Sequence, residues 1–254
     1  MKNQRFRKPY KIKRRKSILR NSFFWIGILI VSLVILLVYF LFFHSFFEIK
    51  NIEISGNNKV KTEQISNLIE KKNIFLFNKK EARGKILNNF PEIVEVIIKR
   101  NLPATIKIEI EERKPVALIC QNDCFFIDKK GIIFEKTENN EILKIKNLTL
   151  NQELKLGEKA LEKEQLDKFL KIESNLKQDL GIKTDLIELV SEKRLNVYIS
   201  EGWQVYFDLQ GDIDWQLVEL KTILEKEISL EEREKLEYID LRFDKTYVSP
   251  EGLL

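Results

Sequence analysis

The most constraining feature of this 254-residue sequence is an uncharged, apolar run of 21 residues at positions 23–43. At about 1.5 Å per residue, a helix of this length is about 31 Å long, which matches the roughly 30 Å hydrocarbon core of a bilayer. Trp25 and Tyr39 lie towards its two ends, where aromatic rings favour the membrane interface. The run therefore predicts one transmembrane helix at 23–43. A buried helix of a soluble core and a cleaved signal peptide both fit its length and flanks less well.

The charges on the two sides of this helix predict its orientation. Residues 1–22 form a tail with ten Lys or Arg residues and no acidic residue, whereas residues 46–50 contain one Glu and one Lys. Because basic flanks tend to stay inside, we expect a cytoplasmic tail and a single-pass, signal-anchored protein with its remaining residues outside the cell membrane. Without the tail, 34 basic residues face 39 acidic ones, a net charge of −5. We interpret the tail as a topology signal with some lipid contact, and expect no nucleic-acid partner.

Residues 46–114 show the pattern β-α-α-β-β. A β-rich stretch at 46–55 ends at a Gly-Asn-Asn turn signal, and the first of two helical stretches has Thr62 as its expected N-cap. The second helical stretch ends before Pro91. Two strands with period-two alternation then flank the turn R-N-L-P-A. Their alternation predicts a common apolar face made by Val94, Val96, Ile98, Ile106, Ile108 and Ile110.

Residues 115–254 predict a β-rich domain with an antiparallel sheet and flanking helices, so the expected fold class is α+β. Short strands should flank the loop C-Q-N-D-C, and a long helix should end at Gly181. Three alternating runs after that helix indicate an antiparallel meander. The expected elements are a helix at 162–180, strands at 186–190, 195–199 and 203–209, helices at 213–227 and 230–236, and a terminal strand.

Two stretches carry a resemblance to a known family. Residues 90–117 read F-P-E-I-V-E-V-I-I-K-R-N-L-P-A-T-I-K-I-E-I-E-E-R-K-P-V-A and resemble the end of a POTRA domain of the FtsQ/DivIB type. That pattern runs F-P, an alternating strand ending in Arg, a turn with Pro, T-I-x-I-x-I and E-R-x-P-x-A. The second match is I-D-L-R at 239–242, before the terminal strand. A single POTRA domain after one membrane helix also differs from the serial POTRA domains of outer-membrane barrel proteins.

The resemblance implies a membrane-anchored cell-division protein of the division septum, with a POTRA domain at 46–114 and an FtsQ-type β domain at 115–254. Such a protein recruits and links division subunits without catalysis. In this family the final strand leaves an open sheet edge, to which a partner adds a strand. The implied partners are small bitopic division proteins, one FtsB- or DivIC-like and one FtsL-like. POTRA is a second docking surface in the family, although the sequence does not indicate which residues it would use.

Carried over by position, the partner-binding residues are Asp240, Leu241, Arg242, Phe243, Lys245, Thr246, Tyr247, Val248 and Ser249. We expect Asp240 and Arg242 to form a structural ion pair on the solvent side of a strand. Ile239, Leu241 and Phe243 should then face the core. The alternative for Tyr247 and Val248 is an ordinary last strand packed on the core.

Catalytic patterns are scarce in the sequence. His44 is its single His and follows the apolar run, so the exported part has no Ser-His-Asp or Cys-His site. No Gly-rich phosphate loop occurs. The 39 acidic residues could include a glycosidase pair, but most alternate with apolar residues or mix with Lys, as on solvated faces. We therefore expect no enzyme activity, no cofactor and no small-molecule substrate.

Cys120 and Cys124 form a C-x3-C pair with three interpretations: a disulfide, two buried free thiols, or a metal site. An exported domain favours the disulfide, because disulfides persist in oxidising compartments. Zinc needs about four ligands, and the sequence offers no second pair or His cluster to complete them. The pair lies outside the family pattern, so we interpret it as a local staple.

Two functions from other classes are the alternatives to a division scaffold. A membrane-anchored cell-wall hydrolase would need a carboxylate pair in a cleft. A POTRA-type chaperone or secretion component would bind unfolded client strands broadly, whereas a division scaffold would bind a few defined partners. Neither alternative accounts for I-D-L-R and the terminal strand together with a single POTRA domain.

Overall fold

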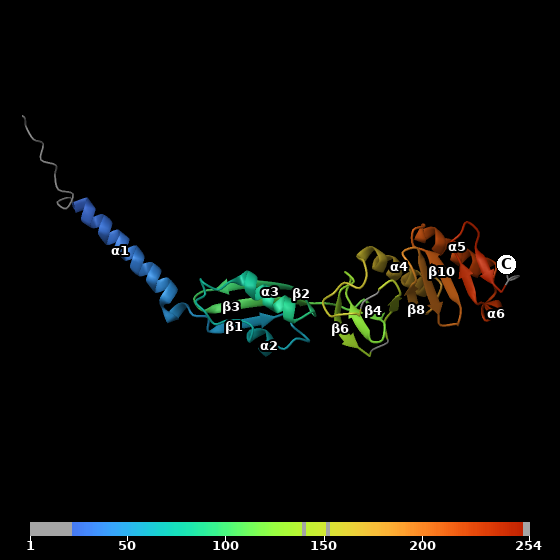
Figure 1. The fold of residues 1–254 in the computed structure, drawn as a ribbon, viewed down its shortest axis with the longest axis horizontal. Coiled ribbons are helices and arrows are strands. Elements are labelled where there is room, and N and C mark those ends of the chain that lie inside the picture. The colour runs from blue at the N-terminus through green and yellow to red at the C-terminus, as the bar shows by residue number, and fades with distance from the viewer. Residues whose placement is uncertain (1–21, 139–140, 151–152, 251–254) are drawn as a thin grey trace, which may run out of the picture. The chain divides into compact units, whose positions relative to one another are not determined.

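The computed structural model describes residues 22–138, 141–150 and 153–250 (Figure 1). The basic tail lies outside the described residues, apart from Ser22. Helix α1 (Ser22–Phe43) is uninterrupted and contains no buried residue. It has a mean hydropathy of 3.1 in an 18-residue window, and it is the one helix of the described part that is long and apolar enough to cross a membrane. The helix expected at 23–43 is therefore confirmed as a helix.

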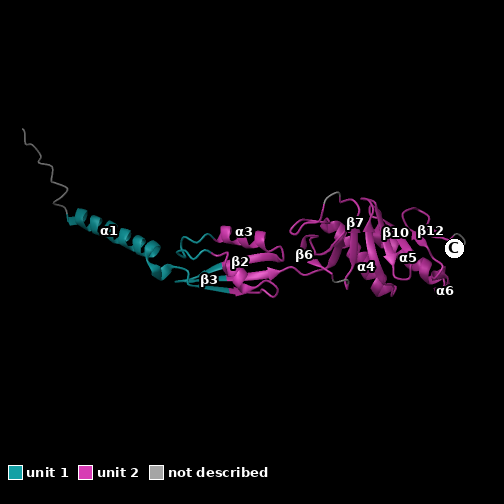
Figure 2. Cartoon of the chain, turned by 60° about the horizontal axis from the view of Figure 1, so that its bottom comes forward, with its two compact units in different colours: residues 1–53, 70–78, 99–107 teal, residues 54–69, 79–98, 108–254 magenta. Residues whose placement is uncertain are grey.

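The contacts of the chain divide it into two compact units, coloured separately in Figure 2. Unit 1 consists of residues 1–53, 70–78 and 99–107, and unit 2 consists of residues 54–69, 79–98 and 108–254. Unit 1 thus contains α1 and three chain segments that follow it. Unit 2 contains the C-terminal half of the chain.

The first folded domain has the predicted β-α-α-β-β order: β1 (Asn51–Ser55), α2 (Thr62–Ser66), α3 (Lys79–Asn89), β2 (Ile93–Asn101) and β3 (Thr105–Glu112). Its three strands are arranged in the order β1-β3-β2. Five of the six residues expected on the apolar face are buried, and the sixth, Val94, is half-buried. Period-two alternation therefore identified the buried face of this hairpin correctly.

Two local expectations in this domain were wrong. Ser45–Phe47 form a short 3-10 helix, η2, where a strand was expected, and His44 caps it by accepting the Phe46 N–H at Nδ1, 3.1 Å away. Helix α2 is short, and its N-cap is Lys61, which makes no side-chain capping bond. The hydroxyl of Thr62 accepts a hydrogen bond from Asn57 Nδ2 at 3.2 Å, so it belongs to the preceding turn.

The E-R pair of the family pattern has structural contacts within unit 2. The Glu112 carboxylate accepts the backbone N–H groups of residues 58, 59 and 60 at 2.8–3.1 Å. Burial alone would raise the pKa of Glu112, but the three N–H bonds outweigh burial and lower it. The Nε of Arg113 donates to the Pro91 carbonyl at 2.8 Å, and its Nη1 pairs with the buried Asp128 carboxylate. These two side chains therefore hold the turn before α2 and the start of the next domain.

The C-terminal domain is built on a nine-stranded sheet with the strand order β12-β11-β10-β9-β8-β7-β4-β5-β6. The strands are β4 (Ala117–Cys120), β5 (Cys124–Ile127), β6 (Ile133–Thr137), β7 (Lys144–Asn147), β8 (Thr184–Leu189), β9 (Arg194–Ile199), β10 (Gln204–Asp208), β11 (Tyr238–Asp240) and β12 (Tyr247–Ser249). The predicted antiparallel meander is confirmed for β8, β9 and β10.

The sheet is mixed, which corrects the expectation of an antiparallel sheet. The pairs β4–β7, β7–β8 and β10–β11 are parallel. A parallel pair of consecutive strands needs a crossover connection, usually through a helix. Helix α4 (Lys163–Asp179) connects β7 to β8, and α5 (Ile213–Lys226) with α6 (Leu230–Arg233) connects β10 to β11. The expected helices are therefore confirmed, and all three lie in the two crossover connections.

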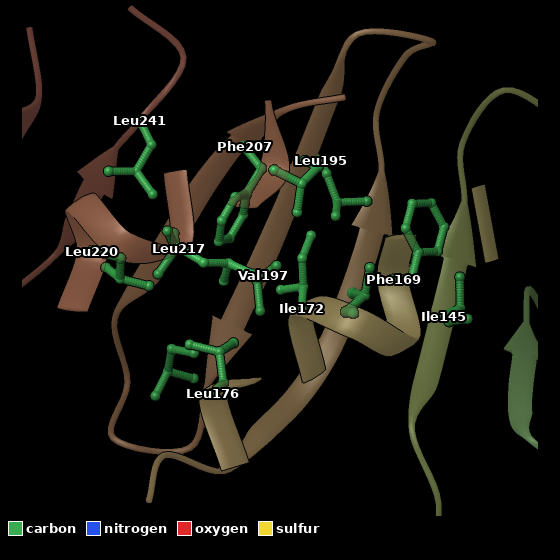
Figure 3. Packing of buried hydrophobic residues seen from close by; sticks show 14 of the residues in the cluster. Ile145, Phe169, Ile172, Leu176, Leu195, Val197, Phe207, Leu217, Leu220 and Leu241 are labelled. Carbon is green, nitrogen blue, oxygen red and sulfur yellow. The ribbon is translucent and has the colours of Figure 1, made fainter. Parts of the chain in front are cut away.

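Helices α4 and α5 pack on the sheet and bury the main core of this domain (Figure 3). Gly181 has a φ of +68°, as expected for the residue that ends a helix in the left-handed conformation. Asp212 caps α5 by accepting the N–H groups of Asp214 and Trp215. The core side chains labelled in Figure 3 come from α4 (Phe169, Ile172, Leu176), α5 (Leu217, Leu220), the strands (Ile145, Leu195, Val197, Phe207) and the residue after β11 (Leu241).

We predict that Glu112→Ala destabilises the fragment 46–254 by about 1–3 kcal/mol, because three N–H groups lose a charged acceptor. Its folded pKa is lowered, so its contribution should be present above the unfolded pKa of about 4.3 and disappear as the pH falls through the folded pKa. Urea unfolding at pH 7 and at about pH 3 measures both effects. Glu111→Ala, on an exposed neighbour, is the matched control. Equal losses in the two variants would contradict a special role for Glu112.

Candidate functional site

The two last strands form one end of the nine-stranded sheet. Strand β11 runs parallel to β10, with Ile239 opposite Val205, and β12 runs antiparallel to β11, with Val248 opposite Ile239. Strand β12 stands last in the strand order, and within residues 22–250, gaps aside, no strand pairs with its outer side. The backbone of residues 247–249 therefore forms an open sheet edge.

Buried side chains attach this edge to the core. Ile239, Leu241 and Val248 all belong to the main core cluster, in which Val248 is 9% exposed. Phe243, which we expected on the core side, is 56% exposed. The reason is that β11 ends at Asp240, so strand alternation does not continue through the bends and loop at 241–246. The Phe243 ring packs edge-on against Tyr247, with ring centroids 5.8 Å apart.

Asp240 and Arg242 form the expected ion pair, on the face of β11 opposite to the core residue Ile239, but Asp240 is covered there instead of solvent-exposed. Asp240 is only 6% exposed. Its Oδ1 accepts hydrogen bonds from Arg242 Nε at 2.8 Å and from the Arg242 backbone N–H at 3.1 Å. Its Oδ2 accepts from Arg242 Nη2 at 2.6 Å, which makes the pair bidentate. The hydrogen bond to Asp240 raises the pKa of Arg242, so the guanidinium keeps its positive charge.

Two tyrosines and a second arginine lie next to the ion pair on the neighbouring strands. The rings of Tyr206 and Tyr238 stack at 5.2 Å. The guanidinium groups of Arg194 and Arg242 lie 4.7 and 5.5 Å from the centroid of the Tyr206 ring. Sequence reasoning missed Arg194, Tyr206 and Tyr238. Alternation could place the two tyrosines away from the core, but nothing local in the sequence shows that β10 and β11 are neighbours.

The polar side chains of the edge mostly bind their own chain. Thr246 Oγ1 donates to the Glu219 carboxylate, and Ser249 Oγ donates to Glu237 Oε2 at 2.7 Å. Lys245 is exposed, and so is Tyr247 at 55%. The exposed side chains of residues 240–249 are therefore those of Phe243, Asp244, Lys245 and Tyr247, of which two are aromatic and in mutual contact.

Cys120 and Cys124 lie opposite one another in the β4–β5 hairpin and form a disulfide, with an Sγ–Sγ distance of 2.02 Å and a Cα–Cα distance of 4.2 Å. In the strand order, β4 and β5 lie towards the end of the sheet that is opposite to β12. The disulfide is therefore not part of the candidate edge. Across the described residues, no group of three or more His, Cys, Asp or Glu side chains could hold a metal ion.

Two family models match the chain, domain by domain. The POTRA domain of the FtsQ type matches residues 47–113, and the C-terminal domain of cell division protein FtsQ/DivIB matches residues 117–242. The fold is thus that of a single-POTRA protein with an FtsQ/DivIB C-terminal domain, a class of cell-division proteins. This chain belongs to the FtsQ/DivIB family.

Its relatives include three cell division proteins DivIB. The one from Clostridium tetani is 36% identical over 124 residues, which cover 47% of this chain and 44% of that protein. The one from Clostridium botulinum is 34% identical over 142 residues, 54% of each protein. The one from Clostridium acetobutylicum is 29% identical over 206 residues, 78% of this chain and 80% of that protein. The first two matches span about half the length of those relatives.

We predict that Arg242→Ala lowers the free energy of unfolding of the fragment 46–254 by about 3 kcal/mol, because it leaves Asp240 buried and charged without its partner. Lys245→Ala, at an exposed position three residues away, should stay within about 0.5 kcal/mol of the parent. Denaturant unfolding at pH 7 measures both values. The double variant Asp240→Leu with Arg242→Met should recover much of the lost stability, since it has no buried carboxylate without a partner. An Arg242→Ala variant with the same free energy of unfolding as the parent would contradict this account.

Proposed function

We propose that this protein is a bitopic scaffold of the division septum. In this proposal α1 crosses the cell membrane, residues 1–22 are cytoplasmic and residues 44–254 lie outside. The length and hydropathy of α1 and the family's role in division support this location. The ten basic residues before α1 support the orientation, because they favour the cytoplasmic side. Residues 46–114 and 115–254 then act as two extracytoplasmic binding modules.

The open edge of β12 is the observation that carries the proposed mechanism. A partner strand adds to this edge through main-chain hydrogen bonds, and the side chains of the partner contact the exposed Phe243 and Tyr247. Ile239 and Val248 keep the edge in place by anchoring β11 and β12 in the core. An uncovered edge with exposed aromatic rings favours aggregation, so a stable protein gains from a partner that covers it.

The proposed partners are an FtsB- or DivIC-like and an FtsL-like bitopic division protein. Their extracytoplasmic segments emerge from the same membrane and can reach the scaffold on the same side. The proposed action is recruitment by binding and includes no catalytic step, cofactor or small-molecule substrate. The site is the set Asp240 to Phe243 and Lys245 to Ser249, in which Asp240, Leu241 and Val248 support the edge from within.

We predict that Tyr247→Glu weakens binding of the fragment 46–254 to the extracytoplasmic segments of these partners about tenfold or more. A buried aromatic anchor commonly contributes 2 kcal/mol or more to an interface, and the carboxylate also opposes burial. Titration calorimetry against each partner segment measures the affinity. The matched control is Trp215→Glu, which places the same charge at another exposed aromatic residue, in α5, and should leave binding unchanged. Equal effects of the two variants would contradict a site at this edge.

We predict that Val248→Pro abolishes this binding, because proline removes a backbone N–H from a three-residue edge strand. Because Val248 is buried, the unfolding curve of the Val248→Pro variant must first show that this variant is folded. Binding that survives in a folded variant would move the site to the POTRA domain or elsewhere. Binding of many unrelated unfolded chains, unaffected by the substitution, would favour the chaperone alternative.

A further inference from the structure

Unit 1 contains a surface, here called the basal surface, made by residues 44–50, 70–78 and 99–104. Backbone hydrogen bonds join its three segments: Ile49 N–H donates to the Lys72 carbonyl at 3.1 Å, and Lys50 N–H donates to the Ala104 carbonyl at 2.8 Å. The Arg100 guanidinium donates to the Phe77 carbonyl at 2.7 Å. The segments therefore form one connected end of the POTRA domain, drawn in the same colour as α1 in Figure 2.

The basal surface is attached to the last turn of α1. The side-chain amide of Asn73 donates to the carbonyls of Leu41 and Phe42 at 2.8 and 3.0 Å. Its Oδ1 accepts the Phe75 N–H at 2.9 Å, and Asn73 is 8% exposed. Carbonyls in the last turn of a helix lack intrahelical partners, so Asn73 supplies bonds that α1 cannot make itself.

Aromatic packing strengthens the same joint. The Phe75 ring lies 6.1 Å from the Phe42 ring and 5.2 Å from the Phe47 ring. Phe42 belongs to α1, Phe47 to η2 and Phe75 to the loop at 70–78. Since α1 is as long as a hydrocarbon core, these contacts place the loop at the level of the lipid head groups when α1 is inserted.

Each segment of the basal surface exposes a large apolar side chain. Phe46 is 50% exposed, Leu76 is 60% exposed and Leu102 is 58% exposed. The same segments contain five basic residues (Lys50, Lys71, Lys72, Lys99 and Arg100) and two acidic ones (Glu48 and Glu70). Exposed apolar side chains among basic ones are the chemistry of a surface that lies on a membrane with anionic lipid.

We propose that the basal surface rests on the outer leaflet of the membrane that α1 crosses, with Leu76 and Leu102 in the head-group region. The exposed Lys50 and Lys71 then face lipid phosphates, and the basal surface is held against the bilayer. This inference rests on the membrane insertion of α1 proposed above. Its occupant is the lipid leaflet, because Asn73 fixes the surface to the end of the membrane helix.

The test uses the full chain in liposomes of phosphatidylcholine and phosphatidylglycerol. Single variants Leu76→Cys and Leu102→Cys are labelled with the fluorophore NBD, and the native cysteines are not labelled because both are in the disulfide. We expect a blue-shifted emission that is quenched by lipids with a nitroxide at the head group. Lys107→Cys is the matched control. It is an exposed position of β3 in unit 1, three residues or about 10 Å from Ala104, and its label should stay unquenched.

A fourth label, at Leu36→Cys in α1, separates the two proposals. Quenching at residue 36 by acyl-chain nitroxides, with residues 76 and 102 behaving like residue 107, would overturn the membrane contact and leave the insertion of α1 intact. An unquenched label at residue 36 would overturn both. A second variant tests the apolar contact directly: Leu102→Glu should reduce the quenching of a label at residue 76, and unchanged quenching would count against a shared contact.

Discussion

The packing of α4 and α5 against the nine-stranded sheet determines how the C-terminal domain presents its last two strands. Because α5 is part of the crossover from β10, its burial places β11 parallel to β10. The chain then turns at 241–246 and returns as β12, which has only β11 to pair with in the described structure. The open edge is thus a consequence of the crossover. Removing apolar contacts beneath α5 would disturb the edge without touching any of its residues.

Local patterns in the sequence predicted the elements well, and long-range pairing was the part they could not supply. Alternation identified the POTRA hairpin and the meander β8–β10, and glycine at 181 marked the end of α4. Parallel pairs such as β4 with β7 join strands that have other elements between them in the sequence, here β5 and β6, and no local pattern indicates such pairs. The burial of Asp240 has a different reason, because its partner is close in the sequence. As a carboxylate in an alternating run it looked solvent-facing, yet Arg242 satisfies it two residues later and lets it be buried.

The residues that carry the family resemblance mostly hold the fold. Glu112 binds three backbone N–H groups, Arg113 joins the Pro91 carbonyl to Asp128, and Asp240 pairs with Arg242. These contacts explain why such a pattern can identify the fold in a sequence. They leave Phe243, Asp244, Lys245 and Tyr247 as the exposed side chains of residues 240–249. A pattern that recognises the scaffold is therefore a poor guide to what distinguishes one partner from another.

The shortness of β12 decides where binding energy at this edge must come from. A three-residue strand offers about three main-chain hydrogen bonds, each contributing about 1 kcal/mol net, whereas a micromolar complex needs about 8 kcal/mol. Main-chain pairing alone would therefore supply several kcal/mol less than the binding free energy of a micromolar complex. Tyr247 is the first residue of β12 and Phe243 packs against it, so the two rings can bury a large apolar area against a partner. Strand addition would then fix the register of the partner, while the aromatic pair would supply most of the affinity and make it sensitive to a single charge.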